Sequence, residues 1–140
     1  MLDDSLKTLE EVEAQFKEPV LGSIGKIPKG NAMDFIAYEP CSAIAYEFLL
    51  LRTNLEFFIV DKSKTTILVT SLGIPEGKLM VAINLTLNHA QTEKKAVLVD
   101  TDFRRSNLHT EVGVANAHGL SDICPGLARL TEVLVRRNNG

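Results

Sequence analysis

Two short apolar runs rich in β-branched residues constrain the fold of this chain most strongly. They are Thr65–Ser71, "TTILVTS", and Ala96–Asp102, "AVLVDTD". Runs that are apolar at successive positions are typical of strands covered on both faces. Between them, Gly77 to Ala90 is apolar on nearly every side, which predicts a buried crossover helix. The pattern therefore predicts an α/β fold in which a small parallel sheet lies between helices.

Bulk properties place the chain among ordinary one-domain globular proteins. It has 140 residues, 45% of them hydrophobic, and a formal net charge of -3, so we expect no nucleic-acid partner. The N-terminus lacks the layout of a signal peptide, and no apolar run is long enough to span a membrane. Cys41 and Cys124 stand far apart without metal-ligand spacing, which indicates free thiols. These features predict a cytoplasmic protein.

The first forty residues differ in character from the rest. Thr8 and Glu11 fit a capping box, and apolar residues follow at helical spacing, so a short helix is predicted near residues 8 to 17. An extended segment broken by glycines and prolines follows it. We therefore divide the chain into an N-terminal helical arm with its linker, residues 1–40, and a body, residues 41–140.

Two further helices are predicted in the body. Ala43 to about Val60 is long, apolar and free of glycine and proline, so its length favours a helix over a strand. Leu127 to Arg136 shows a shorter pattern of the same kind near the C-terminus. We expect these helices to cover the predicted sheet.

The turn after the first predicted strand resembles a phosphate-binding loop. A strand, a glycine turn and a helix start together form an anion site, because unpaired N–H groups and the positive helix end face the turn. Lys78 would place a charge on the phosphates. The strict G-x-x-x-x-G-K-[ST] pattern fails at Leu72 and Leu79, so an ordinary exposed turn stays an alternative. The candidate nucleotide-binding residues are Gly73, Pro75, Glu76, Gly77, Lys78 and Leu79.

Two carboxylates follow the second predicted strand. Asp100 and Asp102 are two positions apart, so on a strand they share one face at the carboxyl end, where parallel sheets bind ligands. Such a pair could hold Mg²⁺ or orient an attacking hydroxyl. The competing interpretation is that the pair only caps a turn or a helix.

Taken together, these segments resemble the bacterial tyrosine kinases of capsule and exopolysaccharide synthesis. The family loop T-S-x-x-P-G-E-G-K-S-T is similar to the segment from Thr70 to Lys78, and its D-x-D-x-R-R motif to Asp100–Arg105. "GLSD", Gly119–Asp122, is similar to a third family segment. "LRTNLEF", beginning at Leu51, resembles part of the helix that packs kinase subunits into a ring. The resemblance covers nearly all of the chain.

This resemblance implies a P-loop NTPase-like three-layer fold and an ATP-dependent transferase that phosphorylates tyrosine. Lys78, Asp100 and Asp102 would be catalytic, the Walker A loop would bind ATP, and the two aspartates would hold Mg²⁺. The family works at the inner face of the membrane with a polysaccharide co-polymerase as partner. A homo-oligomer through the helix near Arg52 is also implied.

Departures from the family pattern predict weakened chemistry. Pro75 replaces a glycine and removes one N–H, and Leu79 replaces the hydroxyl residue that ligates Mg²⁺. Each lost charge-assisted hydrogen bond is worth roughly 1.5 to 3 kcal/mol, or about one to two decades in affinity. The chain also stops before the family's remaining metal motif and its tyrosine cluster. We therefore expect the front portion of a kinase domain, in which binding of both ATP and Mg²⁺ is weakened.

Two functions remain open from the sequence. The first is an ATP-binding tyrosine-protein kinase-like domain with weak or no independent activity, motivated by Lys78 and the aspartate pair. The alternative is a non-catalytic module that docks on a co-polymerase or on kinase subunits through the N-terminal arm and the helix around Arg52.

Overall fold

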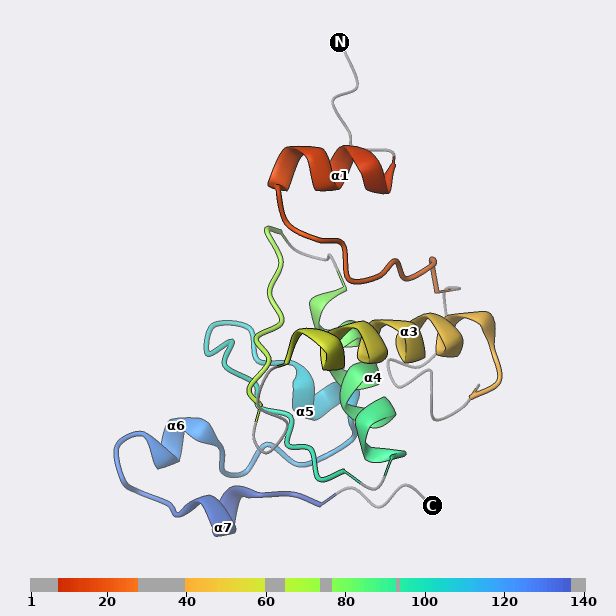
Figure 1. Cartoon of the computed structure of the whole chain (residues 1–140). Coiled ribbons are helices and arrows are strands. Elements are labelled where there is room, and N and C mark those ends of the chain that lie inside the picture. The colour runs from red at the N-terminus through yellow and green to blue at the C-terminus, as the bar shows by residue number, and fades with distance from the viewer. Residues whose placement is uncertain (1–7, 28–39, 60–64, 74–76, 93, 137–140) are drawn as a thin grey trace.

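The computed structural model describes residues 8–27, 40–59, 65–73, 77–92 and 94–136, and within these residues all regular structure is helical (Figure 1). The helices are α1 (Leu9–Phe16), α3 (Ala43–Phe58), α4 (Lys78–Ala90), α5 (Leu108–Glu111), α6 (Leu120–Ile123) and α7 (Leu130–Val133).

The predicted α/β fold with a small parallel sheet is wrong for this structure. In the described residues neither Thr65–Ser71 nor Ala96–Asp102 forms a strand. Most of their side chains are also exposed, with Leu68 at 81% and Val97 at 64% exposure. A β-branched composition favours extended backbone, but a strand also requires a hydrogen-bonded neighbour and a covering layer. Within the described residues neither segment pairs as a strand and most of their side chains are exposed, so the P-loop NTPase-like three-layer arrangement is absent from that part of the chain.

Helix α1 begins with the predicted capping box. The Thr8 hydroxyl accepts the Glu11 N–H and the Glu11 carboxylate accepts the Thr8 N–H, both at 3.2 Å. The helix ends at Phe16, where Lys17 adopts the left-handed conformation with φ of 56°. None of its residues is buried, and in Figure 1 it stands at the edge of the molecule. The short helix predicted near residues 8 to 17 is confirmed.

Two hydrogen bonds hold the segment after α1, residues 20–27, against α3. The Asn54 amide donates to the Leu21 carbonyl at 2.7 Å, and the Glu47 carboxylate accepts the Gly25 N–H at 2.7 Å. Because these contacts join residues 21 and 25 to positions 54 and 47, the segment runs antiparallel to α3. Two polar side chains of α3 thus hold the end of the arm against the body.

The core lies between α3 and α4, which cross in the centre of Figure 1. Phe48 is fully buried, and Ala45 beside it is nearly so. Partly buried apolar residues from the arm and both helices pack on this pair, namely Ile24, Ile44, Leu51, Met80 and Val81. Every residue of α4 from Leu79 to His89 is buried or half-buried, as the apolar pattern predicted.

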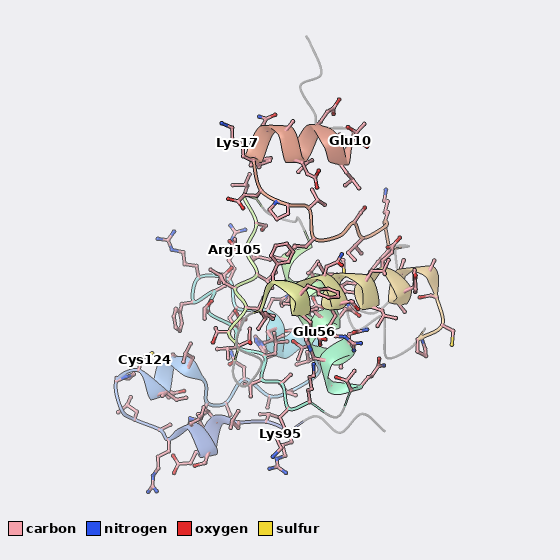
Figure 2. The ribbon with its side chains drawn as sticks, viewed as in Figure 1. Glu10, Lys17, Glu56, Lys95, Arg105 and Cys124 are labelled. Carbon is pink, nitrogen blue, oxygen red and sulfur yellow. The ribbon has the colours of Figure 1, made fainter. Side chains whose placement is uncertain are left out.

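A cluster of charged groups closes the other end of this core. The Arg52 guanidinium donates to the Asn88 carbonyl at 2.8 Å. The Glu56 carboxylate, labelled in Figure 2, lies 2.6 Å from the Lys94 ammonium and 3.9 Å from both Arg52 Nε and His89 Nδ1. The hydrogen bond from Lys94 leads the causes that lower the pKa of Glu56. Arg52, expected at a subunit interface, is thus bonded within the chain.

Folding stability is expected to fall as the pH drops below about 6.5, because His89 is held neutral. Burial is the main cause that lowers the pKa of His89 from its ordinary value of 6.5; Lys94 and Arg52 also lower it, while Glu56 opposes them. A histidine with a lowered pKa binds its proton more readily when unfolded, so acid favours the unfolded chain. Urea unfolding between pH 7.5 and 5.5 measures the free energy of unfolding. In His89→Gln this free energy should depend less on pH. His118→Gln, at an exposed position, is the matched control, and an equal slope in His89→Gln would contradict this account.

In the described residues that follow Asp102, each helix is a single turn. The helix predicted over Leu127 to Arg136 is reduced to α7, because the N–H groups of Leu127 and Ala128 donate to the Asp122 carbonyl and form a turn. The Arg129 N–H then donates to Glu132 at 2.8 Å and starts α7. Among the described helices, none has the length and apolar character to cross a membrane.

Candidate functional site

The candidate site begins at the N-terminus of α4. Gly77 precedes the helix with φ of 80°, in the left-handed region where a side chain is strained. No side chain of the described residues caps this helix end. The first-turn N–H groups and the positive end of the helix dipole are therefore presented at the Gly77 turn, which is the arrangement that anions favour.

Lys78 brings the two sequence motifs together. It is the first residue of α4, and its Nζ lies 3.8 Å from Oδ2 of Asp102, with both side chains nearly 40% exposed. An exposed pair of this kind contributes little to stability, about 0 to 1 kcal/mol. The pair matters because of where it lies: a lysine and a carboxylate that are far apart in sequence meet at the N-terminus of α4.

Asp100 organises the loop around the site. Its Oδ1 accepts the Asp102 N–H at 2.9 Å, and its Oδ2 accepts the Ser106 hydroxyl at 2.9 Å and the Leu108 N–H at 3.3 Å. Partial burial alone would raise the pKa of Asp100, but these hydrogen bonds outweigh it and hold the pKa below its ordinary value. Asp100 therefore stays ionised near neutral pH and fixes the chain that follows it.

Asp102 has the more open carboxylate of the two. Its Oδ1 accepts the Arg105 N–H at 3.1 Å, while Oδ2 faces Lys78. Both aspartates thus also cap local turns, as the competing interpretation stated. In the described part of the chain no group of three His, Cys, Asp or Glu side chains comes together to hold a metal.

Only some of the remaining loop residues lie within the described part of the chain. Ser71 Oγ donates to the Gly73 carbonyl at 3.0 Å, which closes a tight turn before the loop. Leu79 lies half-buried in the first turn of α4. Pro75 and Glu76, two of the candidate nucleotide-binding residues, lie outside the described residues.

The "GLSD" segment forms the start of α6. Its Asp122 carboxylate accepts the Gly119 N–H at 2.7 Å, a contact that satisfies the helix start. His118 Nδ1 lies 3.9 Å from the same carboxylate. Asp122 thus has a structural role at this position, since its carboxylate binds the Gly119 N–H at the start of its own helix.

Sequence reasoning missed Ser106 and Leu108, which donate to Asp100. The backbone N–H of Leu108 carries no residue-specific signal, and a serine six positions after an aspartate belongs to no strong pattern. Only the folded loop shows that these groups complete the environment of Asp100.

The chain is similar to several proteins that are named tyrosine-protein kinases. The chain is 36% identical over 85 residues to the tyrosine-protein kinase YwqD of Bacillus subtilis. It is 30% identical over 129 residues, 92% of its length, to the tyrosine-protein kinase wzc of Salmonella typhi. The crystal structure of the chimerical protein CapA2B2 superposes on 89% of the chain with a TM-score of 0.78 and 31% identity.

The chain corresponds to only part of each relative. It spans 36% of YwqD, 16% of wzc and 53% of the chimerical CapA2B2 chain. No protein-family profile matches it.

Proposed function

We propose, because this chain belongs to the family of bacterial tyrosine-protein kinases, that its loop from Gly73 to Leu79 binds ATP. It is a kinase-like domain, and we place it in capsule or exopolysaccharide synthesis. The whole relatives are longer, so tyrosine phosphorylation by this chain is part of the proposal.

The approach of Lys78 to Asp102 is the observation that carries this proposal. A nucleotide kinase site needs a cation for the phosphates, free helix N–H groups beside it, and a carboxylate for Mg²⁺. Lys78, the uncapped start of α4 and Asp102 supply these three parts within one small region. The residues present therefore fit a nucleotide with its metal, which would neutralise charge on the phosphates.

The two aspartates divide their tasks in this proposal. Asp102 has the oxygen that faces Lys78, so it is the stronger candidate for holding Mg²⁺ or accepting a proton. Asp100 accepts three hydrogen bonds and positions the Asp102 turn. Leu79 supplies no hydroxyl for the metal, which supports weak or no independent kinase activity.

The non-catalytic docking module is the less favoured function. It relied on the N-terminal arm and on the helix around Arg52, and in this structure the end of the arm is hydrogen-bonded to α3 and Arg52 donates to the Asn88 carbonyl. A co-polymerase partner, a place at the inner face of the membrane and self-assembly through the helix near Arg52 belong to the kinase proposal.

Replacing Lys78 by methionine is expected to lower ATP affinity by about one to two decades. The substitution removes one charge-assisted contact to phosphate and keeps most of the length of the unbranched side chain. Fluorescence titration with a labelled ATP, with and without Mg²⁺, measures binding, and ADP release measures turnover.

Lys95→Met provides the matched control, because Lys95 is an exposed lysine outside the site (Figure 2). Its affinity for ATP should equal that of the unaltered chain. Equal ATP affinity in the Lys78 and Lys95 variants, or no measurable binding in any of the three proteins, would sink the proposal.

A further inference from the structure

The hydroxyl of Ser106 is a side-chain donor within the aspartate loop, residues 100–108. It donates to Oδ2 of Asp100 at 2.9 Å. The N–H groups of Asp102 and Leu108 also donate to Asp100, but they belong to the backbone and remain after any substitution except proline. Ser106 is therefore a position at which a change of side chain can tighten or loosen the loop.

The two oxygens of Asp100 are held by different groups. Oδ2 accepts the Ser106 hydroxyl at 2.9 Å and the Leu108 N–H at the longer distance of 3.3 Å, whereas Oδ1 accepts the Asp102 N–H at 2.9 Å. The terminal torsion of an aspartate is soft, so the carboxylate turns unless both oxygens are held. Without the Ser106 hydroxyl, Oδ2 keeps only the longer of these two contacts, and Oδ1 is aimed less firmly at Asp102.

The orientation of Asp100 reaches the proposed metal position through Asp102. The N–H of Asp102 is bound by Asp100, its Oδ1 accepts the Arg105 N–H at 3.1 Å, and its Oδ2 lies 3.8 Å from Nζ of Lys78. Mg²⁺ requires oxygen ligands in near-ideal octahedral geometry at about 2.0 to 2.1 Å. A lysine acts on phosphate as a flexible point charge. A small rotation of Asp102 should therefore weaken metal binding more than it weakens the contact of Lys78 with phosphate.

The aspartate loop has little apolar packing to fix its shape. None of residues 100–108 is buried, and Phe103, its one aromatic residue, is 63% exposed. Helix α5, which begins at the end of the loop, is a single turn, and a helix of that length is marginal in water by itself. The shape of the loop therefore depends on the hydrogen bonds that Asp100 accepts.

We propose that Ser106 is a positioning residue of the nucleotide site, which holds the Asp100 carboxylate so that Asp102 presents Oδ2 to Mg²⁺. The inference rests on the proposed function, because that function brings Mg²⁺ to the site with ATP. Ser106 itself touches neither the metal nor the nucleotide. Groups that orient a metal ligand change metal affinity by about 10- to 100-fold, and Ser106 acts through two residues, so its effect should be about tenfold.

Ser106→Ala in the full chain tests this role. Labelled ATP is titrated first without metal and then at increasing Mg²⁺ concentrations. The ATP affinity without metal should equal that of the unaltered chain, because Lys78 is unchanged. The Mg²⁺ concentration that gives half of the metal-dependent gain in affinity should rise about tenfold. Ser106→Thr keeps the hydroxyl and should keep the Mg²⁺ dependence of the unaltered chain.

Ser121→Ala is the matched control, because Ser121 is an exposed serine on α6, which lies well apart from α4 in Figure 1. It should leave both titrations unchanged. Equal Mg²⁺ dependence in the two alanine variants would overturn the proposal, and so would a Ser106→Thr variant that behaves like Ser106→Ala. A loss of metal-free affinity as large as the loss with Mg²⁺ would show a general structural role instead.

Mn²⁺ alone provides a second measurement that does not need ATP. Titrated into the ¹⁵N-labelled chain, this paramagnetic ion should broaden the amide signals of Asp102 and Phe103, and Ser106→Ala should need about tenfold more Mn²⁺ for the same broadening. A chain that binds no ATP but shows this difference would contradict the kinase proposal and support the role of Ser106. A chain that binds ATP with the same Mg²⁺ dependence in all three variants would overturn the role of Ser106 alone.

Discussion

Replacing Phe48 by alanine is expected to lower the free energy of unfolding by about 3 to 5 kcal/mol. The ring is fully buried where residues 20–27, α3 and α4 meet, so its removal leaves a cavity lined by apolar side chains. A loss of this size corresponds to a drop in Tm of about 10 to 20 °C for a chain of this length. Thermal and urea unfolding followed by circular dichroism measure it.

The control for this change lies on the same helix. Phe57 is 83% exposed, so Phe57→Ala removes the same atoms without opening a cavity and should change stability by less than about 0.5 kcal/mol. If Phe48→Ala and Phe57→Ala unfold at the same temperature and the same urea concentration, the core does not lie between α3 and α4.

Pro75→Gly combined with Leu79→Ser is expected to raise Mg²⁺-dependent ATP affinity by about one to two decades for each contact restored. The glycine returns a backbone N–H that proline lacks, and the serine returns a hydroxyl for Mg²⁺. Leu79 lies in the first turn of α4 beside Lys78, so its replacement acts at the proposed site. Titration with labelled ATP in the presence and absence of Mg²⁺ measures the gain.

The same double change in a Lys78→Met background separates a repaired site from a general effect on folding. In that background the gain should shrink, because the restored groups act on the same phosphates as the lysine. A double variant that folds normally and gains no affinity would show that the loop substitutions do not limit nucleotide binding.

Helices could be predicted from the sequence because their signals are local. The capping box of Thr8 and Glu11 and the long apolar run of α3 each depend on residues within a few positions of one another. The predicted bounds of α3 and α4 agree with the structure to within two residues. Leu127 to Arg136 carried a similar pattern, but backbone contacts to Asp122 shortened that helix to one turn.

The sheet could not be predicted reliably because a strand depends on distant partners. Val97 and Val99 favour extended backbone, but their composition says nothing about whether another segment pairs with them or covers them. At the candidate site the sequence identified Lys78, Asp100 and Asp102. It did not reveal that Ser106 and Leu108 both donate to Oδ2 of Asp100, because hydrogen bonds across a loop follow no periodic sequence pattern.

The single-turn helices α5, α6 and α7 affect how the chain opens. Each has four residues and none buries a side chain, whereas an isolated helix shorter than about 12 to 15 residues is marginal in water. Apart from the Leu108 N–H, which donates to Asp100, their hydrogen bonds are local and can break and re-form without disturbing α3 and α4. The loop that holds Asp100 and Asp102 precedes α5. The proposed site therefore lies between the packed pair α3 and α4 and a segment of single-turn helices, which should open locally at a lower cost in free energy.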